Sequence, residues 1–300
     1  MAHNFSRRQF IQVMGVTSLL IGSQVYANAP KNINVADFGA VGDGVTDDSA
    51  AINKALSALS NGGGTLNFDG SKKYFIGKIE NTISRNFFIL DHPQNLTLNF
   101  NGATLLVNTA VQCSPRIFYV VNPKNLRIND LKVIDLAGMA ISGSNPPNHW
   151  GAALVRVQVR DSNADMGGLT LSNIYAQNLD AVCIIDGWMG NKWAKNRLKN
   201  IVFNNINIFN CYYGVLFQNN GDNVQIKKLR GENVRRLYYP YGISNHDVEG
   251  VIISHGPESN AGSTGCLMFK VYDFPTKNIN ARFKYKGEIS HAYIVSFDLQ

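Results

Sequence analysis

The residues best suited to chemistry gather in two interruptions of an otherwise regular chain, at 144–165 and 187–199. These interruptions hold all three tryptophans of the protein. A flat aromatic side chain can stack on the apolar face of a sugar ring, and a cation can bind a uronate or another acidic substituent. The candidate binding residues are therefore His149, Trp150, Trp188, Lys192 and Trp193. The alternative is that the tryptophans pack the two loops onto the body of the protein.

A second cluster of aromatic and basic residues occupies 235–247. Tyr, Lys, Arg or His can act as the base that removes the proton next to a uronate carboxylate, while cations neutralise that carboxylate. Candidates for this chemistry are Tyr213, Arg236, Tyr241 and His246, and candidates for substrate contact are Tyr238, Tyr239 and Tyr241. Tyrosine is also common on strand surfaces, so a structural role is the alternative.

The elements that must position these residues are short repeated strands. One phrase opens with Asn or Gly and recurs as Asn95-Leu-Thr-Leu, Asn125-Leu-Arg-Ile, Gly168-Leu-Thr-Leu, Asn200-Ile-Val-Phe, Asn223-Val-Gln-Ile, Gly250-Val-Ile-Ile and Asn278-Ile-Asn-Ala. This spacing of one phrase per coil is typical of a solenoid. A second phrase follows at 140–142, 181–183, 214–216, 242–244 and 265–267. Two strand phrases per turn predict a coil whose inward residues stack on those of neighbouring coils.

Asparagines are frequent between these phrases, as at Asn205, Asn210, Asn219 and Asn220. Asn tolerates the left-handed backbone of a bend and can stack into ladders in β-helices. We therefore interpret the asparagines as structural, with sugar binding as the alternative.

The segment at 35–52 combines turn residues with a helix start. Gly39, Gly42 and Gly44 permit tight turns, and Asp47 or Asp48 can cap a helix. The apolar positions of that helix are Ala51, Ile52, Ala55, Leu56 and Leu59. The helix is expected to stop at 61–64, before a first strand at 64–68. The segment resembles the opening of the pectate-lyase-like β-helix superfamily.

This resemblance implies the fold class all-β, a right-handed single-stranded parallel β-helix with an N-terminal capping helix, over residues 30–300. The superfamily includes polygalacturonase-type hydrolases, rhamnogalacturonan-degrading enzymes, alginate epimerases and phage tailspikes. It therefore implies a polysaccharide partner and leaves a homotrimer open.

The region around Asp180 resembles the paired aspartates of polygalacturonase-type hydrolases, but Ala181 stands in place of the second aspartate. Tyr213 stands where that family has a His-Gly motif, and its Arg-Ile-Lys motif is absent, as is the Tyr-Gly-Phe-Asp-Pro-His run of the epimerases. Inverting hydrolysis needs an acid and a base about 6.5 to 9.5 Å apart, and retention needs about 5 Å. Asp180 and Asp186 are the nearest such pair, and a turn or capping role is the alternative for each.

Residues 1–29 resemble a bacterial twin-arginine signal peptide. Arg7 and Arg8 precede Phe10 and a short apolar run at 13–22, which is too short to span a bilayer as a stable helix. Cleavage after Ala29 would place a proline next to the cut bond, so cleavage after Ala27 is preferred. The segment predicts a periplasmic or secreted protein with no membrane partner after signal removal, and a buried amphipathic helix is the alternative.

The composition limits the classes of partner. The chain has 45% hydrophobic residues and a formal net charge of +7, which indicate a folded protein that favours acidic partners. No nucleic-acid-binding motif accompanies its basic residues. The cysteines lack CxxC pairing and are expected to be buried packing residues: Cys113, Cys183, Cys211 and Cys266. No cofactor is expected; calcium, which some pectate lyases use, is the alternative, although no site for it can be read from the sequence.

These features together predict an exported carbohydrate-active enzyme that cleaves an acidic polysaccharide, with a glycoside hydrolase favoured over a polysaccharide lyase. The alternative is a non-catalytic glycan-binding β-helix, such as an adhesin, a tailspike-like protein or a matrix protein. A groove lined by these residues exists only if the Trp188 loop and the segment 238–241 lie on one face of the coil.

Overall fold

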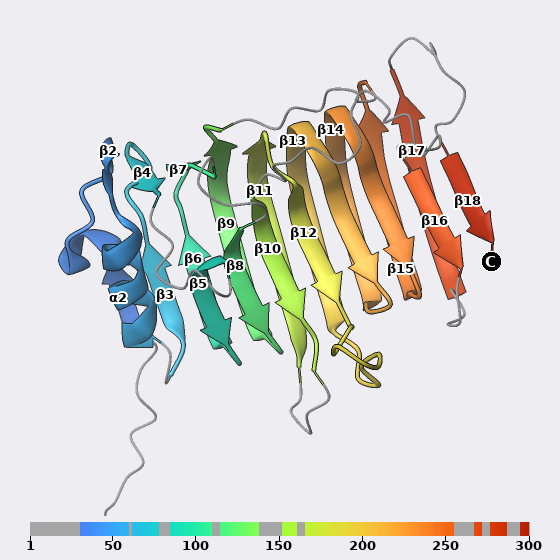
Figure 1. Ribbon diagram of the computed structural model, residues 1–300, viewed down its shortest axis with the longest axis horizontal. Coiled ribbons are helices and arrows are strands. Elements are labelled where there is room, and N and C mark those ends of the chain that lie inside the picture. The colour runs from blue at the N-terminus through green and yellow to red at the C-terminus, as the bar shows by residue number, and fades with distance from the viewer. Residues whose placement is uncertain are drawn as a thin grey trace, which may run out of the picture. The chain divides into compact units, whose positions relative to one another are not determined.

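The computed structural model describes residues 31–59, 62–77, 85–109, 115–137, 152–160, 166–254, 267–271, 277–286 and 295–299. The predicted signal peptide and two candidate binding residues, His149 and Trp150, lie outside them. All paired strands of the described part run parallel (Figure 1). The predicted parallel β-helix is therefore confirmed.

The strand pairings sort into three faces, which we call A, B and C. Face A contains β1 (Lys31–Asn34), β3 (Gly64–Asn67), β6 (Gln94–Asn99) and the first parts of β9 (Lys124–Asp135), β11 (Gly167–Gln177), β13 (Lys199–Gln218), β14 (Asp222–Tyr241), β15 (Ser244–Ile252) and β17 (Lys277–Tyr285). Face B contains β2 (Asp43–Asp47), β4 (Lys73–Ile76), β7 (Thr104–Val107) and the following parts of those long strands. Face C contains β5 (Asn86–Asp91), β8 (Arg116–Val121), β10 (Ala153–Gln158), β12 (Ala181–Asp186), the last parts of β13 and β14, β16 (Leu267–Val271) and β18 (Val295–Leu299).

Each complete coil of the described residues thus carries three strands, one more than the two phrases predicted. The phrase at Gly250 lies on face B, and the strand in register with Asp222 and Lys277 begins at Ser244. The phrase at 242–244 likewise opens a strand of face A rather than face C. The sequence did not show on which face each of these phrases lies, because Gly and Asn begin strands on more than one face.

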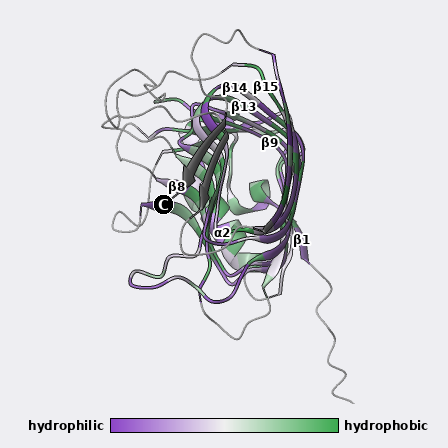
Figure 2. Cartoon of the chain, turned by 90° about the vertical axis from the view of Figure 1, so that its right-hand side faces the viewer, coloured by the Kyte–Doolittle hydropathy of each residue, from purple (hydrophilic) through white to green (hydrophobic). Residues whose placement is uncertain are grey.

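Inward residues stack into continuous ladders across the coils. Figure 2, which looks along the stack, shows the strands winding around this interior. One ladder on face C is fully buried and consists of Phe88, Phe118, Val155, Cys183, Val215 and Tyr238. A buried side chain of this size contributes about 1.5–3 kcal/mol relative to an exposed one. Cys183 and Cys211 are buried and free, as expected of packing residues, whereas Cys113 and Cys266 lie outside the described residues.

Asparagine ladders occupy the bends between the faces, which confirms their structural role. Asn205 and Asn210 have φ angles of 56° and 52°, in the left-handed region that Asn tolerates. The Asn210 amide donates to Asn178 Oδ1 at 2.7 Å, and the Asn233 amide donates to Asn210 Oδ1 at 2.8 Å. These bonds link the same bend of three successive coils.

The capping helix α2 (Ser49–Leu59) lies at one end of the stack (Figure 1). The Asp47 carboxylate accepts from the Ser49 N–H at 3.0 Å, and the Asp48 carboxylate accepts from the Val41 N–H at 2.7 Å. The aspartates of this segment therefore serve the cap and the preceding turn. Strands β1 and β2 and the short 3-10 helix η1 (Val35–Phe38) precede the helix, so the strand at 64–67 is not the first. Within the described residues, no helix has the length and apolar character to cross a bilayer.

Candidate functional site

The outward residues of face C form three rows across the coils, because a parallel register places equivalent positions of neighbouring strands side by side. The start row is Asn86, Arg116, Ala153, Ala181, Tyr213 and Arg236. The middle row is Ile89, Tyr119, Arg156, Ile184, Leu216 and Tyr239. The end row is Asp91, Val121, Gln158, Asp186, Gln218 and Tyr241. Most of the predicted site residues that the structure describes lie in or beside these rows.

A hollow of about 480 Å³ opens on the outer side of β5, β8 and β10, and we call it the arginine hollow. It is lined by Asn86, Ile89, Asp91, Arg116, Tyr119, Val121, Arg156, Gln158 and Arg160. Burial, reinforced by the nearby Arg156 cation, lowers the pKa of Arg116 from its ordinary value. Guanidinium groups stay charged in proteins and bind carboxylates through paired hydrogen bonds. The hollow is therefore suited to an anionic group.

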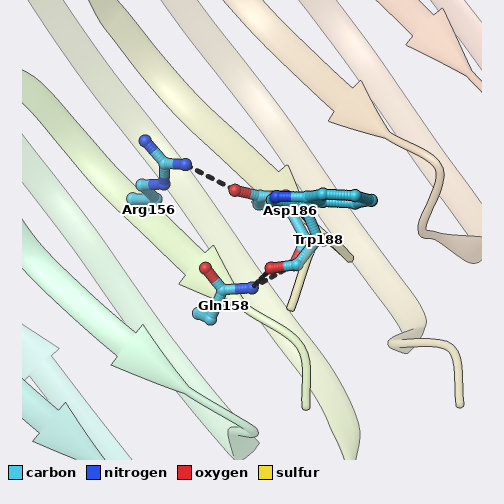
Figure 3. Close-up of polar contacts among 4 residues, drawn as sticks. All are labelled: Arg156, Gln158, Asp186 and Trp188. Carbon is cyan, nitrogen blue, oxygen red and sulfur yellow. Dashed lines mark hydrogen bonds and ion pairs between the residues drawn. The ribbon is translucent and has the colours of Figure 1, made fainter. Parts of the chain in front are cut away.

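Asp186 joins the hollow to the loop that follows β12 (Figure 3). One carboxylate oxygen forms an ion pair with Arg156 Nη2, and the other accepts from the Trp188 N–H at 2.8 Å. Gln158 Nε2 donates to the Trp188 carbonyl at 2.6 Å. Asp186 is buried and has protein partners on both oxygens, so it serves as an anchor rather than as a free acid or base.

The aromatic corner consists of Trp188, Trp193 and Tyr241. The ring centroids of Trp188 and Trp193 lie 5.0 Å apart, and those of Trp193 and Tyr241 lie 5.7 Å apart. Trp188 is 43% exposed, and Lys192, at the tip of the same loop, is exposed. The structure thus brings the Trp188 loop and the tyrosine segment onto one face, as the glycan hypothesis requires.

Asp180 lies just before β12 and is 9% exposed. Its Oδ1 atom has no hydrogen-bond partner in the described part of the chain. Burial raises the pKa of Asp180 to about 7, against the opposing effect of the Arg156 and Arg116 cations. A carboxyl group that titrates near neutrality is suited to proton transfer.

The expected acid–base pairing of Asp180 with Asp186 does not fit the structure. Strand β12 runs from Ala181 to Asp186 without interruption. Six residues of extended strand span about 20 Å, which exceeds the separation that either course of glycoside hydrolysis requires. The sequence suggested the pair because the residues are close in number, whereas the strand holds them apart.

Tyr213, Arg236 and Tyr239 pack together at the other end of the rows. Arg236 Nη1 donates to the Tyr213 hydroxyl at 3.0 Å, and its guanidinium lies 5.5 Å from the Tyr213 ring centroid and 5.3 Å from that of Tyr239. Burial raises the pKa of Tyr213 above its ordinary value, so its phenol stays protonated and is unsuited to act as a base. Arg236 is also no base, because a guanidinium keeps its proton.

The predicted roles of His246 in catalysis and of Tyr238 in substrate contact are wrong, because both side chains are buried. Both lie inside the coil, 2% and 0% exposed, and the Tyr238 hydroxyl hydrogen-bonds His246 Nδ1 at 2.8 Å. Burial lowers the pKa of His246 to about 3. His246 occupies an inward position of face A, and Tyr238 occupies an inward position of face C. The sequence did not reveal these positions, because the face on which a residue lies depends on where each bend falls. Neither can touch a glycan on the outer surface.

The arginine hollow was not predicted from the sequence. Arg116 and Arg156 are 40 positions apart in the chain, and each follows an ordinary strand pattern. Only the register of β8 with β10 places them on adjacent coils. No group of three or more His, Cys, Asp or Glu side chains suited to a metal ion occurs in the part of the chain that the structure describes.

Similarity to known proteins is low in sequence. No curated protein matches the chain significantly. Among solved structures, a candidate glycosyl hydrolase of Parabacteroides merdae is 16% identical, with 89% of this chain and 100% of that chain covered and a TM-score of 0.48. The surface protein and adhesin PfbA of Streptococcus pneumoniae is 15% identical, with 90% and 100% covered and a TM-score of 0.35. The A-module of the mannuronan C-5 epimerase AlgE4 of Azotobacter vinelandii is 16% identical, with 89% and 95% covered and a TM-score of 0.30.

One family model matches residues 32–73, and it is described as rhamnogalacturonase A/epimerase, pectate lyase-like. The matched segment contains the cap and the turns of the N-terminal signature. This match confirms the predicted resemblance to the pectate-lyase-like superfamily.

Proposed function

We propose that this chain, a parallel β-helix of the pectate-lyase-like superfamily, binds an acidic polysaccharide on the outer side of face C. The observation that carries the proposal is the arginine hollow, in which Arg116, Arg156 and Arg160 line one cavity. The exposed Trp188 beside it offers an aromatic face to a sugar ring. The twin-arginine-like segment supports export of the protein to the periplasm or beyond, where such polymers are found.

Binding is tested by titrating the protein with polygalacturonate and with its neutral methyl ester. A charge-assisted hydrogen bond contributes about 1.5–3 kcal/mol, so Arg116→Ala or Arg156→Ala should weaken polygalacturonate binding by about tenfold or more. Arg127→Ala is the matched control, because Arg127 is exposed on face A. Equal binding of the acid and its ester, or equal loss in the control, would refute the proposal.

Cleavage of the bound polymer by elimination is a second candidate function, and Asp180 favours it. The Asp180 carboxyl lies within electrostatic range of Arg116 and Arg156, whereas its expected partner Asp186 is too distant for hydrolysis. Elimination needs cations to neutralise the uronate carboxylate and one group to move a proton. A lyase is therefore favoured over a hydrolase, in the reverse of the order that the sequence suggested.

In the proposed step, the Asp180 carboxylate removes the proton from the carbon that bears the uronate carboxylate. The electron pair of that C–H bond forms a C=C bond to the neighbouring carbon, and the glycosidic C–O bond at that carbon breaks. The proton then passes from Asp180 to the leaving oxygen. The rate should rise with pH through about 7, because the base must be ionised.

The assay follows reducing ends together with the ultraviolet absorbance of the unsaturated product. Both signals rise in an elimination, only reducing ends rise in hydrolysis, and neither rises if the protein is a binding module. Asp180→Asn should abolish the unsaturated product while polygalacturonate binding persists. Product formation at the wild-type rate in that variant would remove Asp180 from the reaction.

A further inference from the structure

The backbone N–H and the backbone carbonyl of Trp188 are both held by side chains of β12 and β10 beside the arginine hollow (Figure 3). Asp186 accepts from its N–H at 2.8 Å, and Gln158, which lines the hollow, donates to its carbonyl at 2.6 Å. The second oxygen of Asp186 pairs with Arg156, which also lines the hollow. A single carboxylate therefore connects the tryptophan loop to a cation of the binding surface.

The loop beyond Trp188 leaves its indole open to solvent. The Ala194 N–H donates to the Gly187 carbonyl at 2.7 Å and the Met189 N–H donates to the Lys192 carbonyl at 2.9 Å, so the loop folds back on itself. Trp193 packs edge-on against Trp188, yet Trp188 remains 43% exposed. The structure thus fixes the backbone of this residue and leaves its ring available for contact.

We propose that Asp186 is a positioning residue that holds Trp188 in a fixed relation to Arg156, so that one acidic sugar chain is bound at two points. A carboxylate of the chain binds in the arginine hollow, and the ring of another unit stacks on Trp188. The inference rests on the proposed function and adds its preferred ligand, which is an acidic oligosaccharide of several units rather than a single uronate.

Asp186 also affects how strongly Arg156 can bind a ligand. Its carboxylate neutralises Arg156, so it competes with any ligand carboxylate for that cation. Removal of the carboxylate should free Arg156 for a small anion and, at the same time, release Trp188. Freeing Arg156 should strengthen the binding of a short anion, whereas releasing Trp188 should weaken the binding of a ligand long enough to reach both sites.

The experiment measures dissociation constants for galacturonate and for an oligogalacturonate in three variants. Asp186→Ala loses both contacts, so galacturonate should bind more tightly, while the oligomer should bind about tenfold more weakly, as expected for loss of one well-placed contact. Asp186→Asn keeps an acceptor for the Trp188 N–H but loses the charge, so both ligands should bind more tightly. Asp247→Ala is the matched control, because it removes an exposed ion pair with Arg282 on face A and should alter neither constant.

An equal loss of affinity for both ligands in Asp186→Ala would indicate general destabilisation and overturn the inference. Wild-type affinity for the oligomer in Asp186→Ala would overturn it as well. If the wild-type protein binds neither ligand, the proposed function fails instead. The near-ultraviolet circular dichroism of the Trp188–Trp193 pair then still reports the positioning, since an unchanged signal in Asp186→Ala would show that Asp186 does not hold Trp188.

Discussion

The hydrogen-bond partners of the buried carboxyl groups separate an anchoring residue from a reactive one. The Tyr238 hydroxyl hydrogen-bonds His246 Nδ1 inside the coil, and the low pKa of His246, about 3, keeps its imidazole neutral even though its Nε2 atom has no partner among the described residues. Asp186 is equally buried, but both of its oxygens have partners. Asp180 differs because one oxygen has no partner among the described residues. The unsatisfied atom, rather than burial alone, singles out Asp180 as the reactive carboxyl.

The raised pKa of Asp180 predicts a pH-dependent stability. The group titrates at about 7 in the folded protein and at about 3.9 in the unfolded chain, so folding takes up a proton between these values. The free energy of unfolding should therefore fall as the pH rises through this window, by up to about 1.4 kcal/mol per pH unit. Asp180→Asn removes this dependence, so the variant should gain stability relative to the wild type as the pH rises between the two pKa values.

Urea denaturation at several pH values measures this difference. Asp247→Asn is a suitable control because Asp247 is exposed on face A. A constant difference in stability between Asp180→Asn and the wild type across the window would show that Asp180 has an ordinary pKa.

At the scale of the elements, the strand decides which side chains share a surface. Alternation along β12 sends Cys183 and Ile185 inward and Ile184 and Asp186 outward. The bends between strands need a left-handed residue, and Asn supplies it together with a side chain that bonds to the next coil. Each bend thus contributes to stability through backbone conformation and through the ladder.

The two contributions can be separated at Asn210. Both variants lose the two ladder bonds, but Asn210→Ala keeps a β-carbon in the left-handed region without the side chain that makes Asn tolerant of it, whereas Asn210→Gly removes the β-carbon. The alanine variant should therefore be less stable than the glycine variant by about 1–2 kcal/mol. Urea denaturation of the pair checks this order, and equal stabilities would mean that the left-handed backbone has no cost at this bend.

At the scale of the described β-helix, each coil contacts only its neighbours, so the stability of a coil depends on the coils beside it. The capping helix α2 covers the first coils and buries Ile52, Leu56 and Leu59. Loss of the cap should loosen the coils next to it before those farther along.

Leu56→Asp tests this expectation, because it places a charge at a buried position of α2. A substitution of this kind costs at least the roughly 2–5 kcal/mol of a Leu→Ala change in a core. Hydrogen exchange should accelerate most in β3 and β6 and least in β13 and β14. Ser57→Asp, on the exposed side of the same helix, is the control, and uniform acceleration in all coils would show that the stack unfolds as one unit.

The sequence by itself determined the parallel β-helix, its capping helix, the structural asparagines and the gathering of the tryptophans in two interruptions, since each depends on local patterns of apolar, turn and aromatic residues. The meeting of Trp193 with Tyr241 depends on how the coils stack. The sequence did not reveal the third strand of each coil or the inward position of His246, because face assignment depends on where each bend falls. The arginine hollow and the separation of Asp180 from Asp186 were decided only by the tertiary structure. Register across coils joins residues that are distant in the chain, and an extended strand separates residues that are close in it.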